Sequence, residues 1–156
     1  MNTFPLDDAA EACALRIRTN AAAFDPDVKV VEFDHYWNVN STASELEARL
    51  PCVLLQFSGG AYTHEQCQVS QRNAFTANYL YPLKGKNRIN PLKAIRTSCE
   101  LLTVGEQFDE VAELVEGLGS STFVSVEVKS SALDNSLVEK NVGWASVTFE
   151  ILNLSQ

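Results

Sequence analysis

Hydrophobic residues recur along this chain at two spacings, one typical of helices and the other typical of strands. In residues 6–21 and 91–102 they lie three or four positions apart, which predicts two amphipathic helices. The same spacing predicts a third helix over residues 108–118. A capping-box spacing followed by Pro51 predicts a short helix over residues 43–50.

Other segments are predicted as strands, because polar and apolar residues alternate in them or because they form short apolar runs. They are residues 28–33, 52–57, 75–81, 123–128 and 144–151. Gly59 and Gly60 follow the second of these runs, and glycine adopts positive φ readily. We therefore expect the chain to leave the sheet at these glycines. Residues 130–143 are expected to form a polar hairpin connection.

The segment of residues 62–90 is long and polar. Apolar and polar residues alternate in its part from residue 75 to residue 81, which supplies more strand than a single small sheet needs. We predict that this segment forms an extended hairpin or arm, inserted in the domain, that contacts a neighbouring subunit.

The order of these elements, with several strands adjacent in sequence, predicts an α+β fold in which helices cover a mainly antiparallel sheet. The length of 156 residues fits one domain, spanning residues 1–156. A domain of this size, with 46% hydrophobic residues, can bury a core without disulfides.

The net charge of −8 argues against a nucleic-acid groove, which needs clustered Lys and Arg to neutralise phosphates. The four cysteines form no CxxC pair, and the N-terminal residues lack the pattern of a signal peptide. No apolar run is long enough for a membrane span. These features predict a protein made and kept in a reducing cytoplasm, away from membranes.

The residues that carry most enzyme chemistry do not converge in the sequence. His35 and His64 match no known metal-ligand spacing, so exposed loop histidines are expected. Ser58 lacks the preceding glycine of a nucleophile elbow, and no phosphate-binding loop occurs. We therefore expect no enzyme, no cofactor and no metal.

Two charged clusters are candidate contact surfaces. Basic residues follow a pair of aromatic residues, and we expect this group to contact an acidic neighbour, such as another copy of the chain. Its members are Tyr79, Tyr81, Lys84, Lys86 and Arg88. Acidic residues gather in and just before the predicted third helix, where they form either the solvated face of that helix or the acidic lumen or interface of a ring. They are Glu106, Asp109, Glu110, Glu113 and Glu116.

Residues 33–37 are rich in aromatic side chains and end in Trp37. Tryptophan and tyrosine are enriched at interface hot spots. Trp37 is therefore a candidate interface residue, with packing across the sheet edge as the alternative.

The layout resembles that of bacteriophage tail-terminator (tail-completion) proteins, in particular the group from Mu-like phages with contractile tails. The resemblance rests on the N-terminal helix, the strand at residues 28–33 and the short helix leading into Leu50-Pro51-Cys52-Val53-Leu54-Leu55-Gln56-Phe57-Ser58-Gly59-Gly60. The late helix over residues 105–118 and the ending Trp144-Ala145-Ser146-Val147-Thr148-Phe149-Glu150-Ile151 also match. The resemblance covers most of the chain but not residues 62–90.

The resemblance implies a structural virion protein, assembled in the host bacterial cytoplasm as a homohexameric ring. Such a ring caps the tail tube, ends its polymerisation and forms the surface that joins the head. The implied partners are other copies of the chain, the tail tube protein, the tail sheath protein and the head–tail connector. DNA passes through the ring without specific binding, and an acidic wall suits that passage. The alternatives are another phage neck or minor tail protein, and a small α+β ligand-binding domain or enzyme.

Overall fold

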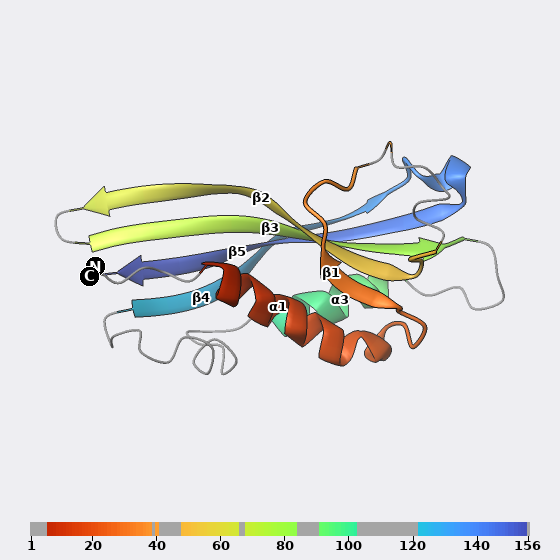
Figure 1. Ribbon diagram of the computed structural model, residues 1–156, viewed down its shortest axis with the longest axis horizontal. Coiled ribbons are helices and arrows are strands. Elements are labelled where there is room, and N and C mark those ends of the chain that lie inside the picture. The colour runs from red at the N-terminus through yellow and green to blue at the C-terminus, as the bar shows by residue number, and fades with distance from the viewer. Residues whose placement is uncertain are drawn as a thin grey trace.

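The structure is a computed structural model that describes residues 6–38, 40, 48–65, 68–83, 91–102 and 122–155. These residues form a five-stranded mixed sheet with two α-helices packed along it, which is an α+β fold (Figure 1). The predicted fold class is therefore confirmed at this level.

The elements have the following bounds. They are α1 (Leu6–Asn20), η1 (Ala21–Ala23), β1 (Val30–Phe33), β2 (Cys52–Glu65), β3 (Gln68–Pro82), α3 (Pro91–Leu102), β4 (Thr122–Asp134), η2 (Val138–Lys140) and β5 (Val142–Ser155). Neither α-helix among the described residues has the length and apolar character needed to cross a bilayer.

The strands lie in the order β1-β2-β3-β5-β4. β1 pairs with β2 in parallel, from Val30 opposite Cys52 to Phe33 opposite Leu55. The other neighbours pair antiparallel. The sheet is thus mainly antiparallel, as predicted, with one parallel edge strand.

One face of the sheet packs against both helices and forms the main core. The strand residues that face the helices alternate along the chain, as the period of two requires. On β3 they include Phe75, Ala77 and Tyr79, all buried. The buried face of α1 is made mostly of alanine together with Cys13 and Ile17, and such small side chains let the helix approach the sheet closely.

The opposite face of the sheet carries a second, smaller cluster at the end where β2 begins. Its buried members are Trp37, Cys52, Leu54, Leu80, Leu137 and Val142. Leu137 lies in the turn between β4 and β5, so that turn and the chain after β1 cover this part of the sheet. Burial raises the pKa of the Cys52 thiol to about 12, so the thiol stays protonated and behaves as a small apolar side chain.

The prediction that the chain leaves the sheet at Gly59 and Gly60 is wrong. β2 runs on through both glycines to Glu65. The register shifts by one residue between Phe57 and Gly59, and Gly59 has φ of 141°. The glycines therefore accommodate a β-bulge, which absorbs one extra residue and lets pairing with β3 continue. A Cβ on Gly60 would lie 2.5 Å from Oδ1 of Asn73, so the side chain of Asn73 occupies the space beside this glycine.

The predicted connection over residues 130–143 is also mostly strand. β4 continues to Asp134 after a second bulge between Val128 and Ser130, and β5 starts at Val142. Ser130 and Ser131 in β4 and Ser136 in the following turn are all exposed, which is why composition alone suggested a loop.

The described part of residues 62–90 belongs to the sheet. β3 pairs with β2 on one side and, from Val69 to Pro82, with β5 on the other. The predicted reach of this hairpin to a neighbouring subunit stays a prediction. The predicted helix over residues 108–118 lies outside the described residues, as does most of the one over residues 43–50.

Candidate functional site at the end of strand β1

The chain leaving β1 continues along the edge of β2 for a short distance. The N–H of Asp34 donates to the carbonyl oxygen of Leu55 at 3.0 Å. Next, the N–H of Phe57 donates to Nδ1 of His35 at 3.1 Å. The imidazole ring stacks on Phe33, with ring centroids 5.6 Å apart. His35 therefore supplies, from a side chain, the acceptor that a longer β1 would have supplied from its backbone.

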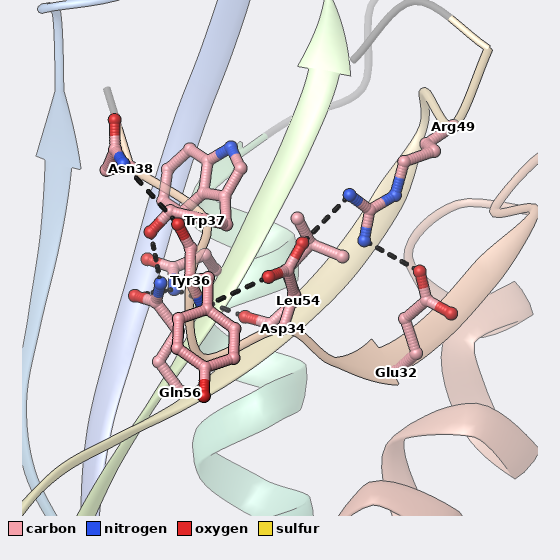
Figure 2. Close-up of polar contacts among 9 residues, drawn as sticks. Glu32, Asp34, Tyr36, Trp37, Asn38, Arg49, Leu54 and Gln56 are labelled. Carbon is pink, nitrogen blue, oxygen red and sulfur yellow. Dashed lines mark hydrogen bonds and ion pairs between the residues drawn. The ribbon is translucent and has the colours of Figure 1, made fainter. Parts of the chain in front are cut away.

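Arg49 joins the end of β1 to the chain that enters β2 (Figure 2). Its Nη2 lies 2.6 Å from Oε1 of Glu32, and its Nη1 lies 2.9 Å from Oδ2 of Asp34. Burial would raise the pKa of Asp34, but hydrogen bonds from Arg49 and from the N–H of Tyr36, with the charge of Arg49, outweigh it and lower that pKa. Arg49 thus fixes the position of the aromatic segment that follows β1.

We expect the interaction free energy between Asp34 and Arg49 to depend on pH and to be lost in acid. Because the pKa of Asp34 is lowered in the folded state, its contribution is present above the ordinary value of 3.8 and is lost as pH falls through the folded-state pKa. A double-mutant cycle with Asp34→Asn and Arg49→Met should give a coupling of about 0.5–1 kcal/mol at neutral pH, since both groups are partly exposed. Urea unfolding measures it. A coupling that stays unchanged at strongly acidic pH would contradict this assignment.

Trp37 lies inside the subunit, on the sheet face opposite the helices. Its ring packs edge-on against Trp144, with centroids 5.1 Å apart, and 6% of the residue is exposed. Its carbonyl oxygen accepts a 2.5 Å hydrogen bond from Nε2 of Gln56 (Figure 2). Gln56 Oε1 in turn accepts from Asn78, whose own Oδ1 accepts from Nε1 of Trp144 at 2.9 Å. This amide network ties the segment after β1 to three strands.

An open apolar cleft of about 780 Å³ lies between the first turns of α1 and the end of β1. It is lined by Leu6, Asp7, Ala10, Glu11, Phe33, His35, Tyr36, Phe57 and Phe75. Phe75 is buried, whereas Phe57 is 46% exposed and Tyr36 is 91% exposed. The floor is therefore aromatic, and the α1 side of the rim carries two carboxylates.

The sheet face opposite the helices becomes polar beyond the Trp37 cluster. The hydroxyl of Thr76 lies 2.9 Å from that of Ser58 and 3.2 Å from that of Thr148, so hydroxyl groups bridge β2, β3 and β5. Further along, Glu150 lies 3.7 Å from Arg72 and 3.6 Å from Lys129. The charges on this part of the face are thus paired locally.

The other two aromatic candidates also lie inside the subunit. Tyr79 and Tyr81 face the helices, with 5% and 8% of each residue exposed, and their rings stack with centroids 4.9 Å apart. The hydroxyl of Tyr79 donates to Oδ2 of the buried Asp25 at 2.5 Å. In the single subunit all three aromatic candidates are buried against residues of the same chain, and their contact with a neighbouring subunit stays a prediction.

The charged candidates lie outside the described residues. They are Lys84, Lys86, Arg88, Glu106, Asp109, Glu110, Glu113 and Glu116.

Sequence reasoning missed the aromatic residues that are exposed on β2. Phe57 is nearly half exposed, and Tyr62 is 67% exposed and accepts a hydrogen bond from Gln71. Residues 59–65 show no alternation of polar and apolar residues, and the two glycines before Tyr62 are typical of a strand end, so no sequence signal indicated the exposure of Tyr62. His35 was expected in a loop, and it is exposed, but its role as a backbone acceptor carries no sequence signal.

In the part of the chain that the structure describes, no group of three or more His, Cys, Asp or Glu is arranged to hold a metal ion. The features that stand out are a long sheet with exposed aromatic residues and an apolar cleft beside its edge. No protein-family model and no curated protein matches this chain.

Proposed function

We propose that this chain is a structural virion protein, a homohexameric ring that caps the phage tail tube, ends its polymerisation and forms the head–tail joining surface. The observation that carries the proposal is the end of the sheet that extends beyond both helices (Figure 1). There, β2 continues from Gly59 to Glu65, and its residues 60–64, with Tyr62 among them, are exposed. A long strand that one subunit leaves exposed is suited to contact between subunits.

The sequence resemblance agrees with this assignment in its order of elements. A helix, a short strand, a strand entered through Leu50-Pro51 and a C-terminal strand that begins near Trp144 all occur in the described fold. The net charge of −8 suits a ring through which DNA passes without being held. Its partners would be other copies of the chain, the tube protein, the sheath protein and the connector.

The first test is the mass of the purified chain over a range of concentrations, by sedimentation velocity, with images of negatively stained particles. We expect a hexamer that appears as a ring. Added to growing tail tubes, the protein should bind one end and stop elongation, which antibody labelling and tube-length distributions measure. A monomer at every concentration, or tubes that keep growing, would refute the proposal.

Charge reversal gives a matched comparison in the same assay. Replacing Lys84, Lys86 and Arg88 by glutamate should weaken assembly most at low ionic strength, where screening is least. Replacing the exposed Lys29, Lys93 and Arg96 changes the net charge equally and should leave assembly intact. Equal effects of the two variants would mean that net charge alone, and no local contact, governs association.

The apolar cleft supports a second candidate, a small ligand-binding domain. Its volume of about 780 Å³ lies in the range of small-molecule sites, and the carboxylates of Asp7 and Glu11 would favour a cationic ligand with an apolar body. The mass measurement separates the two candidates, because a ligand-binding domain of this kind is expected to stay monomeric. Another neck or minor tail protein would assemble but would not stop tube growth.

A further inference from the structure

Among the described residues, two strands of the sheet have outer edges with no strand paired to them over part of their length. β1 pairs with β2 only as far as Leu55, and His35 accepts the N–H of Phe57. From Gly59 to Glu65, no strand among the described residues pairs with the outer side of β2. In Figure 1 this half of β2 forms the upper border of the sheet, and β4 forms the opposite border. No strand in the described ranges pairs with the outer side of β4.

The two open edges flank the same part of the sheet. Gly59 pairs with Ala74, Ala74 with Glu150, and Glu150 with Glu127. At the far end His64 pairs with Val69, Val69 with Ser155, and Ser155 with Thr122. Residues 59–64 of β2 and residues 122–127 of β4 are therefore stretches of equal length at equal height.

The strand directions also match. Each step from β2 through β3 and β5 to β4 is antiparallel, so β4 runs opposite to β2. If two copies lie side by side in the same orientation, β4 of one meets β2 of the other as an antiparallel pair. The alternation of strand directions then continues across the contact. Such a head-to-tail contact is heterologous, the type that closes into a ring.

Within residues 59–64, the edge of β2 carries no lysine, proline or bulge that would hinder strand addition. Natural sheets protect open edges with lysine, proline or bulges. β2 has its bulge before Gly59, and residues 59–65 contain no lysine, arginine or proline. β4 carries Lys129 at its own bulge, but the ammonium group lies 2.8 Å from Glu127 and 3.6 Å from Glu150, so its charge is already paired.

We propose that β4 of one subunit adds to the open edge of β2 in the next, through residues 122–127 and 59–64, so that a continuous antiparallel sheet runs through the assembly. This inference rests on the self-association in the proposed function and names the strands that form the contact. The exposed Tyr62 lies on the edge strand that the neighbour would cover.

The backbone groups that would bond to the neighbour can be identified from the register. The carbonyl oxygen of Leu55 and the N–H of Phe57 point away from β3, toward β1 and His35. Phe57 pairs with Phe75, and Gly60 and Tyr62 pair with Asn73 and Gln71, which lie two and four residues along β3. Residues two apart on a strand point their backbone groups the same way. Gly60, Tyr62 and His64 therefore direct their N–H groups outward.

A proline at Tyr62 tests this contact, because proline removes the outward N–H while the β2–β3 hydrogen bonds remain. Tyr62→Ala is the matched control, since it removes the same aromatic ring and keeps the N–H. We expect Tyr62→Ala to lose only what the ring itself contributes to the contact, and Tyr62→Pro to weaken association about tenfold or more per contact beyond that loss. Sedimentation velocity measures both, and circular dichroism checks that each variant is folded.

Cysteine cross-linking tests the same pairing without proline. Ala61 pairs with Arg72, Arg72 with Leu152, and Leu152 with Ser125. Ala61 and Ser125 therefore lie at the same level on the two edges. In a Cys67→Ser background, chains carrying Ala61→Cys mixed with chains carrying Ser125→Cys should give covalent dimers with a short bismaleimide, whereas the background alone should not. If the wild type forms a ring but this cross-link does not form, the strand pairing is wrong and the proposed function still stands. The same conclusion follows if Tyr62→Pro and Tyr62→Ala weaken association equally. A wild-type chain that never associates overturns both.

Discussion

Replacing Phe75 by alanine is expected to destabilise the subunit by about 3–5 kcal/mol, the usual range for truncating a buried phenylalanine. Phe75 is 3% exposed and sits at the centre of an aromatic group. Its ring centroid lies 5.4 Å from that of Phe57, 5.8 Å from that of Phe149 and 6.3 Å from that of Phe33. The variant loses the buried area of the ring and its packing with all three neighbours. Since domains of this kind have about 5–15 kcal/mol of stability, unfolding by urea or heat should detect the change easily.

Phe57→Ala is the matched control for this prediction. Phe57 belongs to the same aromatic group and lines the same cleft, but 46% of it is exposed. Less area returns to water when its ring is removed, so we expect a loss of about 1–2 kcal/mol. If the two variants were equally destabilised, the aromatic group would not be centred on Phe75 as described.

The fold class followed from local patterns because those patterns reflect burial in one subunit. Residues 75–81 alternate in sequence because Phe75, Ala77, Tyr79 and Tyr81 face the helices. The start of the helix at Pro91 was predicted correctly, since Asn90 and Pro91 mark it in the sequence. The parallel pairing of β1 was not predictable, because it depends on contacts between distant segments.

The extended half of the sheet was missed because its signals conflict. Gly59 and Gly60 resemble a strand end, and only the pairing with β3 reveals that they hold a bulge inside a longer strand. Serine, threonine and charged residues in β4 and β5 reflect a solvated face rather than a loop. Because of this polar composition, the part of the sheet on which the proposed assembly depends was not predicted as strand.

The candidate site was predictable only in part, because the number of aromatic residues does not indicate their exposure. Trp37 was left open between an interface and packing, and in the subunit it packs on Trp144. The basic residues that follow Tyr79 and Tyr81 indicate a contact surface, but the period of two places both tyrosine side chains on the face toward the helices. Tyr62 is exposed instead.

Tyr79→Phe is expected to cost about 1.5–3 kcal/mol of stability, although it removes a single oxygen atom. The hydroxyl of Tyr79 donates to Oδ2 of Asp25, a residue that is 1% exposed, and Oδ1 of Asp25 accepts the N–H of Asp27 at 2.8 Å. Without the tyrosine hydroxyl, the buried carboxylate of Asp25 loses the shorter of these two hydrogen bonds and keeps the one from the N–H of Asp27. Urea unfolding of the wild type and the variant measures the difference.

Tyr81→Phe is the control, because Tyr81 lies on the same strand and face and stacks on Tyr79. We expect it to cost less than about 1 kcal/mol, since its ring packing is kept. Adding Asp25→Asn to Tyr79→Phe should recover part of the loss, because a neutral amide costs less to bury than a carboxylate. Equal losses for Tyr79→Phe and Tyr81→Phe would mean that the bond to Asp25 contributes nothing.

The pH dependence of this difference gives an independent check. Burial and the hydrogen bond to Asp25 raise the pKa of Tyr79, so the folded protein keeps the phenol protonated where the unfolded chain begins to ionise, near the ordinary value of 10.0. Because the unfolded state then binds fewer protons than the folded state, this group's contribution falls as pH rises above that value. The gap between the wild type and Tyr79→Phe should therefore be largest near neutral pH and shrink in alkali. A gap that stayed constant through this range would show that Tyr79 ionises equally in both states, and so that its hydroxyl is not held by Asp25 in the core.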